Sequence, residues 1–169
     1  MAEHRRIHLT TLKLTDFRNF ATLKLETGPE HIVLTGENGA GKTNLLEAVS
    51  FLSPGRGIRR AAYDTVARRG GPGTWSVHAE LEAADDRVEI GTGLSASHLG
   101  VDTQRQTRIN TTRVRNGDEL LDHLRVVWLT PAMDGLFTGP ASERRRFVDR
   151  LVLEIDPAHG RRVKELEKS

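Results

Sequence analysis

Apolar and polar residues alternate along the first part of the chain with the two-residue period of a half-buried strand. This alternation covers residues 7–17 and 20–25 and predicts two β-strands. A third strand is predicted at 31–35, a short β-prone run that follows Gly28 and Pro29. Residues 44–52 instead place apolar side chains at helical spacing. The chain is therefore expected to form three strands before its first helix.

The strand-like alternation returns in the middle of the chain, after an arginine-rich loop at 53–73. A β-rich stretch of roughly forty residues at this point departs from a simple alternation of strands and helices. One or two helical turns are expected at 117–124, and a buried strand at 125–129 that stops at Pro131. The strands predicted in the β-rich stretch are 75–81, 88–90 and 108–115.

Helical spacing takes over near the C-terminus. Ser142 is expected to cap a helix, and Asp156 with Pro157 to begin another at 158–168, as N-cap and first helical residue. The apolar face expected on the first of these helices consists of Phe147, Leu151, Val152 and Ile155.

A glycine-rich loop connects the strand predicted at 31–35 to the helix predicted at 44–52. Its glycines leave room for successive backbone N–H groups to surround a phosphate, and the start of the helix adds partial positive charge. Lys42 would reach the β- and γ-phosphates of a nucleotide, and Thr43 would place its hydroxyl on Mg²⁺. The predicted phosphate-binding loop (P-loop) consists of Gly36, Glu37, Asn38, Gly39, Ala40, Gly41, Lys42 and Thr43.

Length and composition describe an ordinary globular chain. Its 169 residues suffice for one core-forming domain, with 37% hydrophobic and 28% charged residues. No apolar run is long enough to span a bilayer and no signal-peptide core is present, so a cytoplasmic location is expected. With no cysteine the chain has neither disulfides nor thiolate metal sites, and its seven histidines show no paired metal-ligand spacing.

Two simpler P-loop classes fit the sequence poorly. A GTPase would need an Asn-Lys-x-Asp motif to read guanine, and the chain contains none. A small-molecule kinase would return quickly to parallel strands after the P-loop helix, whereas here the β-rich stretch follows. The kinase remains an alternative, as does a non-catalytic nucleotide- or DNA-binding module.

Five segments in a fixed order resemble the N-terminal part of the bacterial RecF family, which belongs to the SMC-like branch of the ABC ATPases. The resemblance extends over essentially the whole chain, and the ordered series is far more specific than the P-loop alone. The segments are residues 14–20, 36–48, 52–56, 129–131 and 143–150.

The resemblance implies an α/β fold of ABC-ATPase head type, with a mixed parallel and antiparallel sheet, ending before the Walker B strand. Residues 1–139 would form ATP-binding lobe I and residues 140–169 the first helices of helical lobe II. ATP with Mg²⁺ would clamp a homodimer onto single-stranded or gapped DNA. RecR- and RecO-type proteins would be partners, in DNA replication, recombinational repair and the SOS response.

Family members hydrolyse ATP with a Walker B Asp-Glu pair and a partner's Leu-Ser-x-Gly-Gln loop, both beyond the region matched here. Residues 151–156 imitate Walker B but follow a helical period, and residues 52–56 lie where the family has its own turn. The chain is therefore expected to bind nucleotide but to hydrolyse it poorly. Where the family has a Q-loop Gln, Asp134 either supplies an oxygen to Mg²⁺ through water or begins a turn.

Arginines are the candidate contacts for anions outside the P-loop. The resemblance places Arg18 near the nucleotide, and the alternative is a solvated loop arginine. The other arginines cluster along the sequence and would attract DNA phosphates, or else form ordinary charged faces. The clusters are Arg56, Arg59, Arg60, Arg68 and Arg69; Arg105, Arg108, Arg113 and Arg115; and Arg144, Arg145, Arg146 and Arg150.

Overall fold

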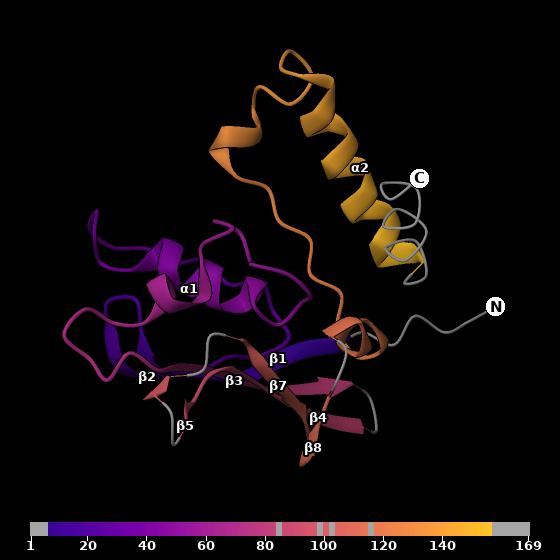
Figure 1. Ribbon diagram of the computed structural model, residues 1–169. Coiled ribbons are helices and arrows are strands. Elements are labelled where there is room, and N and C mark those ends of the chain that lie inside the picture. The colour runs from indigo at the N-terminus through magenta and orange to yellow at the C-terminus, as the bar shows by residue number, and fades with distance from the viewer. Residues whose placement is uncertain (1–6, 84–85, 98–99, 102–103, 115–116, 157–169) are drawn as a thin grey trace. The chain divides into compact units, whose positions relative to one another are not determined.

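A computed structural model of the chain describes residues 7–83, 86–97, 100–101, 104–114 and 117–156 (Figure 1). The chain divides into two compact units, Met1–Leu124 and Arg125–Ser169, and each is described by itself. No helix in the described ranges is both long and apolar enough to cross a bilayer.

The first unit is built on a six-stranded sheet in the order β2-β1-β3-β4-β7-β8, with a separate two-stranded hairpin β5-β6. Every strand pair in the described ranges is antiparallel. The α/β class is confirmed, and the predicted strands at 7–17, 20–25, 75–81 and 88–90 all form. The strands are β1 Ile7–Phe17, β2 Phe20–Glu26, β3 Trp75–Ala83, β4 Asp86–Leu94, β5 Ala96–Ser97, β6 Gly100–Val101, β7 Gln106–Ile109 and β8 Thr112–Arg113.

One helix, α1 Lys42–Ser50, packs on this sheet (Figure 1). Alternate residues of β3 and β4 are buried, as the two-residue period requires of a sheet with one covered face. The core centres on an aromatic cluster in which the ring of Phe51 lies 6.0 Å from Phe17 and 5.0 Å from Trp75. All three rings are at most 2% exposed. Short 3₁₀ turns at Tyr63–Val66 and Gly117–Asp122 complete the unit.

The strand predicted at 31–35 does not form, and this expectation was wrong. These residues have no regular structure, and Ile32 and Val33 are 51% and 80% exposed. A strand requires a neighbour for its backbone hydrogen bonds, and no strand in the described ranges pairs with this segment. The stretch predicted as one strand at 108–115 also differs, because β7 and β8 form a hairpin that turns at Asn110.

The second unit contains the 3₁₀ turn Pro131–Met133 and helix α2 Ala141–Ile155. The buried strand predicted at 125–129 was wrong, since these residues are irregular and Leu129 is 74% exposed. Ser142 does not cap α2, because the helix begins one residue earlier and Pro140 is its N-cap. Helix rather than Walker B strand is confirmed for residues 151–155. The final helix predicted at 158–168 lies outside the described residues.

Candidate nucleotide-binding site

The loop at 36–43 owes its path to three glycines with positive φ. Gly36, Gly39 and Gly41 have φ values of 136°, 90° and 105°, a region that residues with a Cβ rarely adopt. Gly41 is also the N-cap of α1, and a Cβ on it would lie 2.6 Å from the Phe20 ring. The positive φ and the close contact with Phe20 therefore both require glycine at the point where the loop enters the helix.

Lys42 closes the loop on itself. Its Nζ donates hydrogen bonds to the carbonyl oxygens of Gly36 at 2.6 Å and Glu37 at 2.7 Å. No side chain caps the start of α1, so the amides of its first turn are available to an anion. Thr43 is exposed in that first turn. A cation, uncapped amides and a hydroxyl thus converge at one helix end, which fits a phosphate chain with a hard divalent cation.

Glu47, one helical turn after Thr43, is a fully buried carboxylate held by two arginines. Arg18 donates two hydrogen bonds to this carboxylate, from Nε to Oε2 at 2.7 Å and from Nη2 to Oε1 at 2.5 Å. Arg59 donates through Nη1 to Oε2 of the same carboxylate. Arg18 also donates to the Thr65 carbonyl at 2.7 Å. The structure therefore brings Arg18 to the P-loop helix, where its guanidinium binds Glu47.

Two asparagines extend this network to the start of the helix. Asn44 donates to Oδ1 of Asn19 at 2.7 Å, and its own Oδ1 accepts from Arg59 at 2.8 Å. Asn19 belongs to the turn between β1 and β2, and it also lies against Gly41. The turn that carries Arg18 is thereby joined to the helix that carries Lys42.

Arg105 holds the other end of α1. Its guanidinium donates to the carbonyls of Phe51, Ser53 (3.0 Å) and Gly55 (2.9 Å), and Nε donates to Thr92 Oγ1 at 2.5 Å. It also lies 5.5 Å from the centre of the Phe51 ring. Burial lowers the pKa of Arg105 to about 10, so the side chain remains cationic at neutral pH. A cation here complements the negative end of the helix dipole.

The predicted arginine clusters are divided between internal contacts and exposed positions. Arg59 and Arg105 bind groups around α1, Arg68 pairs with Asp16 at 2.8 Å, and Arg144 donates to the Gly139 carbonyl at 2.7 Å. Arg108 and Arg113 are exposed register partners on β7 and β8. The exposed members also include Arg56, Arg60, Arg69, Arg145 and Arg146. Arg115 lies outside the described residues, and nothing is described of the side chain of Arg150.

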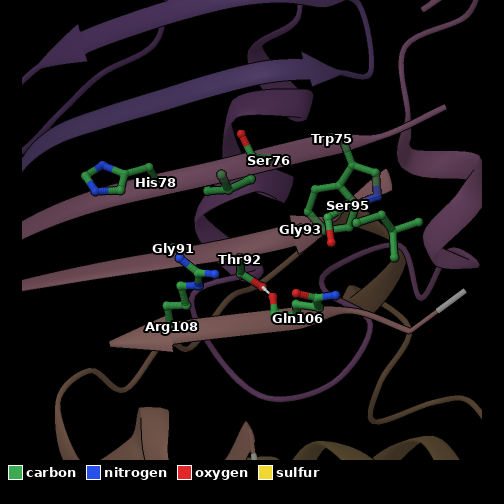
Figure 2. Close-up of a pocket in the computed structure, with 11 residues that line it drawn as sticks. Trp75, Ser76, His78, Gly91, Thr92, Gly93, Ser95, Gln106 and Arg108 are labelled. Atoms are coloured by element: carbon green, nitrogen blue, oxygen red, sulfur yellow. Dashed lines mark hydrogen bonds between the residues drawn. The ribbon is translucent and has the colours of Figure 1, made fainter. Parts of the chain in front are cut away.

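A separate hollow of about 340 Å³ lies over β3, β4 and β7 (Figure 2). Gly91 and Gly93 on β4 have no side chains to fill the space above the strand. The hollow therefore opens between His78 on β3 and Arg108 on β7. Nε2 of His78 lies 3.5 Å from Glu89. The lining of the hollow contains no residue of the P-loop and none of the residues hydrogen-bonded around Glu47.

Asp134 lies at the end of the Pro131–Met133 turn, where its backbone N–H donates to the Pro131 carbonyl at 3.0 Å. The residue begins a run of turn residues, as one of the two sequence interpretations expected. A role in holding Mg²⁺ stays a prediction.

Sequence reasoning did not find Glu47. It found Arg59 as a basic residue but did not find its contact with Glu47. The available signal was the position of Glu47 four residues before Phe51, on the helix face that enters the core. A charge on such a face requires a buried partner.

Comparison with known proteins shows which family and which relatives this chain is similar to. Residues 11–123 match the AAA domain family. The chain is 61% identical over 164 residues to the DNA replication and repair protein RecF of Rhizobium meliloti, covering 97% of this chain and 43% of the relative. Identity to RecF of Agrobacterium fabrum is 57%, with the same coverage. The chain therefore spans less than half the length of these curated relatives.

Solved structures show the same similarity in three dimensions. A structure of the recombination mediator protein RecF with ATP, from the RecFOR pathway, has a TM-score of 0.81 and 25% identity over 98% of this chain and 44% of its own. An ATPrS-bound RecF structure gives 0.77 and 26%, over 92% and 41%. An SMC ATPase structure shares the fold, with a TM-score of 0.63 at 18% identity over 85% and 99%.

Proposed function

The chain belongs to the AAA domain family, and from that membership and its similarity to RecF we propose that it binds ATP as part of a DNA replication and repair ATPase. The observation that carries the proposal is the glycine loop folded around Lys42 at the uncapped start of α1. Gly36, Glu37, Asn38, Gly39, Ala40 and Gly41 supply the phosphate-facing backbone, Lys42 the cation, and Thr43 the ligand to Mg²⁺.

Thr43 would hold Mg²⁺, which would neutralise part of the charge of the triphosphate. The residues of this chain bind and orient the triphosphate: amides of the first turn of α1 face it, and the Lys42 ammonium moves from the loop carbonyls to phosphate oxygens. The donor set fits, because hydroxyl and phosphate oxygens are the ligands that Mg²⁺ prefers.

Hydrolysis by residues 1–169 alone is proposed to be slow. Transfer of the γ-phosphoryl group to water needs a further acidic group at the metal and a group that positions the water. In the family that the chain resembles, these come from the Walker B strand and the signature loop of a second protomer, beyond the matched region.

The wider role follows the relatives. We propose lobe I at 1–139 and the beginning of lobe II at 140–169, an ATP-dependent homodimer, and contact with single-stranded or gapped DNA through exposed arginines. RecR- and RecO-type partners, SOS-linked repair and a cytoplasmic location belong to the same proposal. Support comes from the RecFOR pathway named for the solved RecF structures and the ATP-driven dimerization named for the SMC structure.

Titration with labelled ATP, with and without Mg²⁺, tests the proposal. Lys42→Ala should weaken binding at least about tenfold, the loss expected for a charge-assisted hydrogen bond. Lys13→Ala is the matched control, because Lys13 lies on β1 and pairs with Glu80 at 3.0 Å. Equal ATP affinity in the two variants would refute the site. Phosphate release at about 1 s⁻¹ or faster, within the range of ordinary enzymes, would refute slow hydrolysis.

A further inference from the structure

Glu47 is the one fully buried carboxylate among the described residues, and its charge balance is unusual. A buried carboxylate is stable only when paired and hydrogen-bonded. Glu47 accepts from Arg18 and Arg59, so two cations share one anion. The cluster of Arg18, Arg59 and Glu47 therefore has a net formal charge of +1.

The position of this charge connects it to the P-loop. Glu47 lies four residues after Thr43, and side chains at this spacing share a helix face about 5–6 Å apart. Asn44, on the same side, accepts from Arg59 and donates to Asn19. The surplus charge thus lies about one helical turn behind the residue proposed to hold Mg²⁺.

The bonds to Glu47 also fix where the two guanidiniums lie. Arg18 comes from the turn after β1 and has a left-handed backbone, with φ of 55°. Arg59 comes from the loop after α1, and 40% of its side chain is exposed. Asn44 also joins both segments to α1, through Asn19 and Arg59, but Glu47 is the residue of α1 that binds both guanidiniums.

We propose that Glu47 is a positioning residue of the nucleotide site: it holds Arg18 and Arg59 so that their surplus positive charge acts on the triphosphate. The proposal rests on the proposed ATP binding. Glu47 touches neither phosphate nor metal and acts through the two arginines. ATP carries more negative charge than ADP, so the arrangement favours ATP over ADP.

Glu47→Gln distinguishes a positioning role of Glu47 from a direct effect of its charge on ATP binding. The substitution keeps the shape and makes the cluster one unit more positive, which by charge alone would tighten ATP binding and increase the preference for ATP. Positioning predicts the reverse, because an amide offers one acceptor atom where the carboxylate offers two. We expect ATP affinity to fall at least about fivefold and the ATP-to-ADP preference about threefold, since charge-assisted bonds are the stronger ones.

Calorimetric titration of the full chain with MgATP and MgADP measures both quantities. Glu89→Gln is the matched control, since this glutamate is half exposed on β4 and lies outside the network. If wild-type protein binds no ATP, the proposed function fails and Glu47 has no site to position. If wild type binds and Glu47→Gln loses ATP and ADP affinity equally, or loses none, the positioning role is overturned.

A variant that keeps the charge covers the case in which Glu47→Gln does not fold. Glu47→Asp shortens the side chain by one methylene and withdraws the carboxylate from the two guanidiniums. We expect a smaller loss of ATP affinity than in Glu47→Gln, again with a reduced preference for ATP over ADP. An unchanged preference in Glu47→Asp would overturn the proposal.

Discussion

Replacing Arg105 with Met should destabilise the first unit. The substitution removes the donors to the carbonyls of Phe51 and Ser53, which belong to buried residues, whereas Gly55 is exposed and its carbonyl can reach water. Leaving a buried acceptor unpaired costs about 1–3 kcal/mol. Two such carbonyls set the loss at about 2–6 kcal/mol, and removing a guanidinium that burial disfavours offsets part of it. We expect a net loss of about 2–4 kcal/mol.

Urea unfolding followed by tryptophan fluorescence measures this loss. A Trp128→Phe background leaves Trp75, in the aromatic core, as the reporter for the first unit. Arg108→Met is the matched control, since Arg108 is exposed on the neighbouring strand and its replacement should change stability by no more than about 0.5 kcal/mol. If the free energies of unfolding of both variants lie within about 0.5 kcal/mol of the wild-type value, the hydrogen bonds from Arg105 to the carbonyls do not hold the end of α1.

Two further predictions concern the loop and the sheet. Gly41→Ala should cost more stability than Gly70→Ala, because both glycines have positive φ, worth about 1–2 kcal/mol of strain, but only a Cβ at Gly41 meets other atoms. Thermal melts that rank the two variants equally would contradict the contact with Phe20. The hydrogen bond from Lys13 lowers the pKa of Glu80 below its ordinary 4.5, so its contribution should be present above pH 4.5 and lost as pH falls through the folded-state pKa. Glu80→Gln should therefore cost up to about 1 kcal/mol at pH 7, with the difference disappearing in acid; a difference that persists at low pH would exclude this ion pair as the cause.

Alternation of apolar residues was enough to predict β1, β2, β3 and β4. In β3 and β4 every second side chain of the buried stretch faces the core, so the sequence period and the burial period coincide there. The P-loop was equally accessible, because its glycines are dictated by local backbone geometry. Such features depend on neighbours in sequence and can be predicted without knowing the fold.

The failures share a different cause. Residues 31–35 and 125–129 have strand-like composition, yet a strand exists only beside another strand, and composition does not say whether a partner is present. Glu47 was missed, and Arg105 was expected to contact anions rather than backbone carbonyls, for a related reason. Each looks like an ordinary charged residue until residues 29 and 54 positions away, Arg18 and Phe51, are brought into contact with it.

The core and the candidate site are joined through two consecutive residues, the last of β1 and the first of the turn that follows it. Phe17 is fully buried against Phe51 and Trp75, and the next residue, Arg18, grips Glu47 on α1. Packing of the Phe17 ring therefore fixes the backbone from which Arg18 reaches the helix. Phe51 in turn follows the end of α1 and carries the carbonyl and the ring that Arg105 contacts. α1 is thus held at its middle and its C-terminal end, while its start has no side-chain cap and follows the exposed glycine loop, where backbone amides are available to a phosphate.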